Sequence, residues 1–108
     1  MAKVEKKAAQ RKAESPPKNP KNYVASVGKA FAVLQSFSSE AFELTLSDIA
    51  AAADLDRGTA FRLIQTLVEL GYLQAVPHSR RFRLGVACLD LGYTVLSHGS
   101  LRPMVEPL

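Results

Sequence analysis

Residues 56–67, DRGTAFRLIQTL, hold side chains that could read DNA. If Ala60, Leu63, Ile64, Leu67 and Leu70 form the buried stripe of a helix, six residues remain at or near its outer face: Arg57, Gly58, Thr59, Phe61, Arg62 and Gln65. Glutamine can pair with adenine, arginine reaches guanine or phosphate, and an aromatic ring can contact a thymine methyl group. Gly58 would allow close approach of the sugar-phosphate backbone, and the first N–H groups of a helix favour a phosphate. The alternative is an ordinary exposed helix face with one stray aromatic residue.

A second polar group follows, where YLQAV and RFRLG indicate two short strands around the turn PHSR, a β-hairpin. Its candidate DNA contacts are Ser79, Arg80, Arg81 and Arg83. A basic hairpin can lie along a phosphate backbone or insert an arginine into the minor groove. The alternative is a solvated turn.

The segment before these groups predicts two helices. Ser26 can cap the first, whose apolar face is expected to be Val27, Ala30, Phe31, Leu34 and Phe37. A brief alternation that resembles an edge strand follows at Phe42, Leu44 and Leu46. Thr45 and Asp48 have the spacing of a capping box, which predicts a second, short helix carrying Ile49, Ala50 and Ala53.

The third helix is the one that carries the candidate DNA-reading residues. Asp54 and Leu55 form a tight connection before it, with Leu55 as an apolar plug, and Asp56 caps its first turn. We expect it to run to Leu70 and to stop at Gly71 in a left-handed conformation.

Helical periodicity returns beyond Gly85, with Val86, Leu89, Tyr93 and Leu96 on one face and Leu91 and Val95 on another. A helix that is apolar on two sides usually packs against two partners. We expect a homodimer with an interface formed by Leu89, Tyr93 and Leu96. The alternative is that both faces pack within one chain. A further apolar pattern begins between Arg102 and Leu108.

The order of helix, helix, tight turn, helix and hairpin predicts a mainly α fold with a small β-hairpin, a winged helix-turn-helix followed by a linker helix. In such a fold the third helix packs one face on the first two and lays the other in the major groove of double-stranded DNA. The sequence therefore favours a DNA-binding protein. The alternative function is a winged-helix protein-interaction module, since this fold does not by itself imply DNA binding.

Composition limits the remaining possibilities. The 108 residues suit one small domain, and a single cysteine, Cys88, fits a reducing compartment, so we expect a cytoplasmic protein. No uncharged apolar run approaches the roughly 18 residues of a membrane span. His78 and His98 lie far apart and no base accompanies the thiol, so we expect no enzyme activity, no metal site and no cofactor.

Residues 1–22 have a different character from the rest. They hold seven basic and two acidic residues, three prolines and almost no large apolar residue, whereas residues 23–108 hold seven basic and eight acidic residues. This composition predicts a disordered basic tail. It is either a solvated leader or an arm that contacts phosphates.

The span from Tyr23 to Leu108 resembles the N-terminal DNA-binding half of IclR-type bacterial transcription regulators. The similarity lies in SVGKAFAVLQSF, LTLSDIAAAADLDRGTAFRLIQTLVELGYL and RRFRLGVACLDLGYTVL. It implies a dimeric regulator in which Thr59 and Arg62 match the Ser/Thr and Arg of the family's recognition helix. It also implies control of a catabolic operon, and members that govern aromatic-compound degradation look closest.

The resemblance also implies a division of the chain. Residues 23–85 would form the DNA-binding domain, and residues 86–108 the linker and dimerisation helix with the start of an effector domain. The family's C-terminal effector-binding domain is absent from this chain, so a small-molecule effector is expected only if that domain exists outside it. Asp54 stands where the family usually has glycine in the turn, and aspartate tolerates a left-handed backbone better than most residues.

Overall fold

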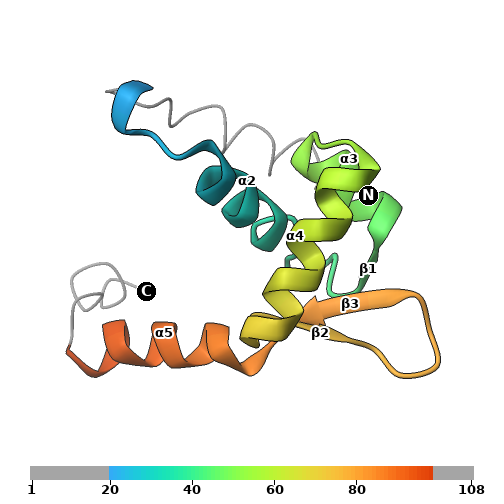
Figure 1. Cartoon of the computed structure of the whole chain (residues 1–108). Helices are drawn as coiled ribbons and strands as arrows, with labels where there is room; N and C mark the ends of the chain where they lie inside the picture. The colour runs from blue at the N-terminus through green and yellow to red at the C-terminus, as the bar shows by residue number, and fades with distance from the viewer. Residues whose placement is uncertain (1–19, 99–108) are drawn as a thin grey trace.

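The computed structural model describes residues 20–98, which form four α-helices and a small sheet (Figure 1). In chain order the elements are the 3₁₀ helix η1 (Pro20–Asn22), α2 (Ala25–Leu34), β1 (Leu44–Thr45), α3 (Leu46–Ala53), α4 (Arg57–Leu70), β2 (Leu73–Ala75), β3 (Arg81–Leu84) and α5 (Val86–Ser97). The predicted tail lies outside the described residues except for Pro20–Asn22, and so does the apolar pattern after Arg102.

The helix-turn-helix, α3 and α4, begins and turns as predicted. The backbone N–H of Asp48 donates to Thr45 Oγ1 at 3.2 Å, and the backbone N–H of Thr45 donates to Asp48 Oδ2 at 3.1 Å, which completes the capping box. Asp54 ends α3 in the left-handed region at φ 59°. The turn thus forms with aspartate in place of glycine.

The prediction for α2 was wrong in its cap and in its buried face. The helix starts after Val24 without a side-chain cap, so Ser26 lies inside its first turn. Ala32 and Val33 are the buried residues of α2, whereas Val27 and Phe31 are 52% and 51% exposed. Of the expected stripe, only Phe37 is buried, and it lies beyond the end of the helix. The other four residues of the expected stripe line an open groove.

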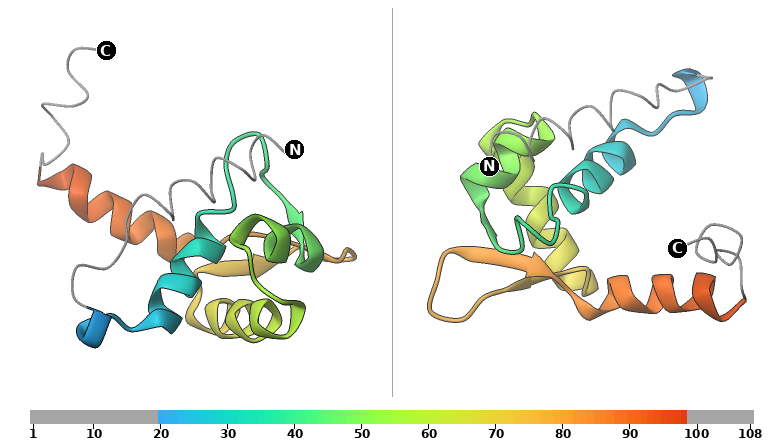
Figure 2. Two further views of the ribbon diagram at one scale, coloured as in Figure 1. Left: turned by 90° about the horizontal axis from the view of Figure 1, so that it is seen from above. Right: turned by 180° about the vertical axis from the view of Figure 1, so that it is seen from behind.

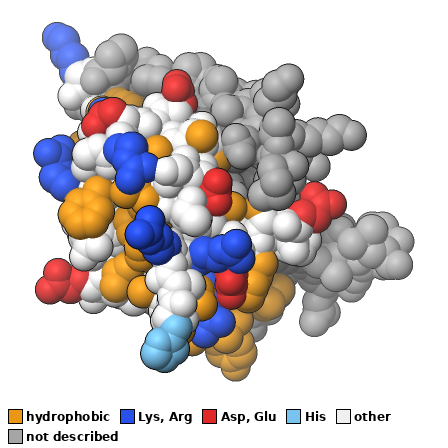
Figure 3. Space-filling view, turned by 90° about the vertical axis from the view of Figure 1, so that its right-hand side faces the viewer, with side chains coloured by type: hydrophobic (Ala, Val, Ile, Leu, Met, Phe, Trp, Pro, Cys, Tyr) orange, Lys and Arg blue, Asp and Glu red, His pale blue; other side chains and the backbone are white. Residues whose placement is uncertain are grey.

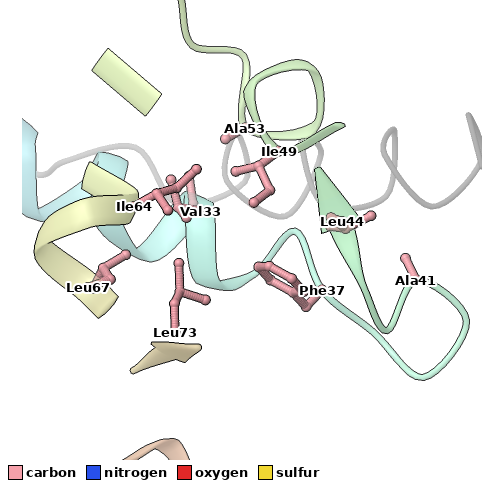
Figure 4. Packing of buried hydrophobic residues seen from close by; sticks show 10 residues of the cluster. Val33, Phe37, Ala41, Leu44, Ile49, Ala53, Ile64, Leu67 and Leu73 are labelled. Carbon is pink, nitrogen blue, oxygen red and sulfur yellow. The ribbon is translucent and has the colours of Figure 1, made fainter. Parts of the chain in front are cut away.

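The core lies where α2, α3 and α4 meet the sheet (Figure 4). It is built mainly from aliphatic side chains: Ala32, Val33, Phe37, Ala41, Leu44, Ile49, Ala53, Ile64, Leu67 and Leu73. Leu55 packs against this cluster, as expected of an apolar plug. Leu70, predicted to be buried, is 61% exposed because it lies in the last turn of α4, beyond the core.

The sheet has three antiparallel strands in the order β1-β3-β2, rather than the two of the predicted hairpin. Leu44 pairs with Phe82 and Thr45 with Arg81, which ties the segment before α3 to the wing. The predicted alternation at Phe42, Leu44 and Leu46 shortens to two residues because Leu46 already opens α3.

The root of α5 is held against the end of α4 by backbone groups. Gly71 ends α4 at φ 91°, as predicted, and its carbonyl accepts the N–H of Ala87 at 3.2 Å. The carbonyl of Tyr72 accepts the N–H of Gly85 at 2.9 Å. From this joint, α5 and the hairpin extend in opposite directions (Figures 1 and 2). No residue of α5 is buried, so the described residues fully cover neither of its apolar faces.

The cap of α4 yields a prediction on stability and its pH dependence. The backbone N–H and then the hydroxyl of Thr59 bond to the Asp56 carboxylate and lower its pKa. Asp56→Ala should therefore lower the melting temperature at pH 7 by a few degrees, whereas Asp56→Asn should lower it less because asparagine also caps helices.

The change in stability in acid follows from the lowered pKa of Asp56. A carboxylate with a lowered pKa in the folded state stabilises the fold above its unfolded pKa, about 3.9. That stabilisation is lost as the pH falls through the folded value. Differential scanning calorimetry between pH 7 and pH 2 should show the gap between wild type and Asp56→Asn closing in acid. A gap that widens in acid would contradict this role of Asp56.

Candidate DNA interface

Helix α4 turns its two faces as the sequence predicts. Ala60, Ile64 and Leu67 are buried against the core, while the opposite face exposes Gly58, Phe61, Arg62 and Gln65. Within the described residues, the Arg62 guanidinium and the Gln65 amide make no hydrogen bond or ion pair. An exposed arginine and glutamine one helical turn apart, both without partners, are free to contact another molecule.

The side chains at the start of α4 make hydrogen bonds within the protein that the sequence does not indicate. Thr59 is half-buried, and its hydroxyl donates to Asp56 Oδ1 at 2.7 Å, which leaves the hydroxyl oxygen free only as an acceptor. The Arg57 guanidinium donates to the hydroxyl of Ser47 on α3. Sequence reasoning did not select Ser47, although it lies in the first turn of α3, ten residues before Arg57.

The candidate wing residues differ in the bonds that their side chains make within the protein. Ser79 Oγ donates to the Val76 carbonyl at 2.9 Å and accepts the N–H of Arg81 at 3.1 Å, so its hydroxyl shapes the turn. Arg83 is half-buried and its Nε donates to Gln74 Oε1 at 3.3 Å. The closest approach of Arg81 to Glu43 is 4.0 Å, a weak exposed pair.

Arg80 is the exposed wing arginine without a side-chain partner among the described residues. Figure 1 shows the hairpin projecting beyond the helices, and Figure 3 views the molecule from that side. Lys and Arg side chains lie on this face, interspersed with Asp and Glu side chains (Figure 3). A projecting wing with positive charge is a suitable surface for a polyanion.

The predicted dimer residues lie on an unpartnered helix face. Leu89, Tyr93 and Leu96 are 70%, 68% and 59% exposed. The other side of α5, at Cys88 and Leu91, borders a groove of about 640 Å³. Apolar side chains of α2 and α4 line most of the rest of the groove, among them Val27, Phe31, Leu63, Leu67 and Leu70.

Cys88 is part of the joint rather than a reactive group. Its Sγ donates to the Tyr72 carbonyl at 3.4 Å, and partial burial raises the pKa of its thiol. Between residues 20 and 98, no three or more His, Cys, Asp and Glu residues gather where they could hold a metal ion. No helix in this range has the length and apolar character to cross a membrane.

Three helices, a left-handed turn before the third and a three-stranded wing define a winged helix-turn-helix domain. Residues 26–77 match the model of the IclR helix-turn-helix domain. The chain belongs to this family of transcription regulators, which are not enzymes, and carries its DNA-binding domain.

Individual relatives agree with this assignment. The chain is 36% identical over 84 residues to the HTH-type transcriptional regulator TsaQ1/TsaQ2 of Comamonas testosteroni, covering 78% of this chain and 30% of that protein. It superposes on an IclR family regulator from Brucella abortus with a TM-score of 0.73 and 30% identity, covering 86% of this chain and 35% of the other.

A further solved structure holds a ligand. It is an IclR homolog from Microbacterium hydrocarbonoxydans complexed with 4-hydroxybenzoate, with a TM-score of 0.61 and 27% identity, covering 76% of this chain and 35% of that one. This chain spans about a third of the length of the curated relatives it matches.

Proposed function

We propose that this chain recognises a specific DNA sequence by placing α4 in the major groove. The observation that carries the proposal is the outer face of α4, where Arg62 and Gln65 are exposed and have no side-chain partner among residues 20–98. Arg62 hydrogen-bonds guanine or a phosphate, Gln65 pairs with adenine, and Phe61 contacts a thymine methyl group. Gly58 admits the DNA backbone, because among the described residues a Cβ there would meet only Asp56 Oδ2, at 3.3 Å.

The remaining proposed contacts are to phosphates. Arg57 and the N–H groups at the start of α4 bind one strand, and Thr59 contributes its oxygen as an acceptor. Arg80 and Arg81 follow the backbone beside the wing. Ser79 and Arg83 support these contacts from within the hairpin, since their side chains bond to other wing residues.

The experiment is a selection followed by a binding measurement. A duplex selected from a random-sequence pool by this chain should share a motif of a few base pairs. A scrambled duplex of the same composition should bind more weakly by at least about 10³-fold. Recovery of no common motif would overturn sequence-specific binding.

We also propose that two copies of the chain associate through α5. Its outer face carries Leu89, Tyr93 and Leu96, and the groove between α2, α4 and α5 is apolar and open. In a symmetric dimer each copy supplies the same surface, so α5 of one copy can cover the apolar surface of the other. The two α4 helices would then meet half-sites about 34 Å apart, one turn of DNA.

Substitution on α5 tests this assembly. Leu89→Asp should weaken self-association at least about tenfold, because a carboxylate would be buried without a partner. Thr94→Asp places the same charge on the polar side of α5 and should leave association unchanged. Sedimentation over a range of concentrations, with and without DNA, measures both. A wild type that stays monomeric on DNA would contradict the dimer.

We also propose a role for each part of the chain. Residues 23–85 bind DNA, and residues 86–108 link this domain to an effector-binding region, while the basic residues of 1–22 contact phosphates without sequence preference.

We propose catabolic genes as targets, with aromatic-compound degradation the first class to test, since one solved relative is a complex with 4-hydroxybenzoate. Transcript levels in a strain lacking the gene, grown with and without aromatic substrates, test this assignment.

A further inference from the structure

The tip of the wing holds a histidine in a conformation that most side chains avoid. His78 lies at φ 60°, in the left-handed region. The loop around it is firmly closed, since the N–H of Val76 donates to the Arg81 carbonyl at 2.9 Å and Ser79 Oγ to the Val76 carbonyl at 2.9 Å. Glycine would occupy this position without strain, whereas the Cβ of another residue is crowded there.

Nothing in the described part of the chain accounts for an imidazole at this position. His78 is exposed, and it makes no hydrogen bond or ion pair with any residue between 20 and 98. Its flanking residues Pro77, Ser79 and Arg80 are also exposed, so the tip projects into solvent. The imidazole therefore adds no contact within the described residues and is free to contact an external partner.

The surroundings of the tip fit a negatively charged partner. Arg80 is adjacent and free, and Arg81 follows at the start of β3, with Glu43 the acidic residue that approaches Arg81. In a narrow minor groove, the strong negative potential attracts Arg, Lys and His side chains. The floor of that groove at A·T pairs presents only acceptors, adenine N3 and thymine O2. A protonated imidazole offers two N–H donors to such acceptors.

We propose that His78 enters the minor groove beside the site read by α4, and that it binds there in its protonated form. This inference rests on the proposed function, because it requires the wing to lie on DNA. Imidazole groups change charge between about pH 5 and pH 8. A nearby polyanion favours the charged form, so DNA binding strengthens as the pH falls and the added contact is lost as the pH rises.

The chain provides its own controls. His98 is the second of its two histidines and lies at the C-terminal end of α5, away from the wing. Asparagine tolerates a left-handed backbone, so His78→Asn keeps the turn while removing the imidazole. His98→Asn removes the other histidine in the same way.

The experiment measures affinity for the selected duplex against salt concentration at pH 5.5 and pH 8, by fluorescence anisotropy. For wild type and His98→Asn, the slope of log K against log salt should steepen by about 0.9 at pH 5.5, the value for one added ionic contact. Affinity in 0.1 M salt should rise by roughly three- to tenfold. His78→Asn should show neither change.

Changing flanking A·T pairs to G·C places an amino group in the minor groove and should remove the pH effect in wild type. A slope that is equal at both pH values in wild type, or a pH effect that survives in His78→Asn, would overturn the role of His78. In both cases the preference for the selected duplex would remain. Absence of that preference at either pH would instead contradict DNA recognition by α4.

Discussion

Gly85→Ala should destabilise the fold by about 3 kcal/mol or more, the largest stability effect we expect from a single methyl group. A Cβ at residue 85 would lie 2.2 Å from the carbonyl oxygen of Gly71 and 3.2 Å from the N of Leu73. Both neighbours are backbone atoms in the joint between α4, β2 and α5, so neither can move aside independently. The φ of Gly85 is −91°, which alanine adopts freely, so lack of space is the whole cause.

Thermal and urea unfolding followed by circular dichroism measure this effect, with Gly92→Ala as the matched control. A Cβ at Gly92 meets nothing within 4 Å, and the residue lies inside α5. The same substitution should there stabilise the helix by about 0.5–1 kcal/mol. Opposite signs at the two glycines are the expected result. A Gly85→Ala variant as stable as wild type would contradict the close approach of Gly71 and Gly85.

Arg62→Ala should weaken binding to the selected duplex by about 10- to 100-fold, equivalent to roughly 1–3 kcal/mol. The side chain is exposed and bonds to nothing in the described protein, so its truncation removes only external contacts. The melting temperature should therefore stay close to that of wild type. If Arg62 reads a base, the variant should also lose its preference at one position of the motif.

Lys29→Ala is the control for this substitution. It removes the same charge from an exposed position on α2, outside the proposed interface. Anisotropy titrations of both variants, against selected and scrambled duplexes, separate a specific contact from a general effect of charge. Equal losses in the two variants would exclude Arg62 from the interface.

The helix-turn-helix could be predicted closely because its signals are local. Asp56 and Gly71 define the ends of α4, and Thr45 with Asp48 defines the start of α3. Each of these residues bonds to a backbone group within a few positions, so its type alone indicates its role. The same holds for the outer face of α4, since the position of the core stripe determines which residues face away.

The misassigned parts depend on contacts between distant segments. Val27 and Phe31 have helical spacing that is typical of a core face, yet the core of α2 centres on Val33. The pairing of Leu44 with Phe82 joins residues 38 positions apart, and no turn residue indicates that the two segments pair. Periodicity indicates that a face is apolar but not which element covers it.

The hydrogen bonds that the candidate site residues make within the protein also could not be predicted from the sequence. The type of Arg57 suggests a phosphate contact, but only the packing of α3 beside α4 places Ser47 within its reach. Ser79 was selected as a DNA contact, and its part in closing the wing turn was not foreseen. The sequence does not indicate the positive φ of His78, because glycine or asparagine is the usual residue in that conformation.

The most direct test of the central claim, that α4 and the wing bind a specific DNA sequence, is the salt dependence of affinity for selected and scrambled duplexes. The log of the association constant should fall linearly with log salt, by about 0.9 for every phosphate neutralised, and steeply enough to require several such contacts. The selected duplex should remain preferred at every salt concentration. Affinity that does not respond to salt and does not distinguish the two duplexes would contradict DNA recognition and favour a protein-interaction module.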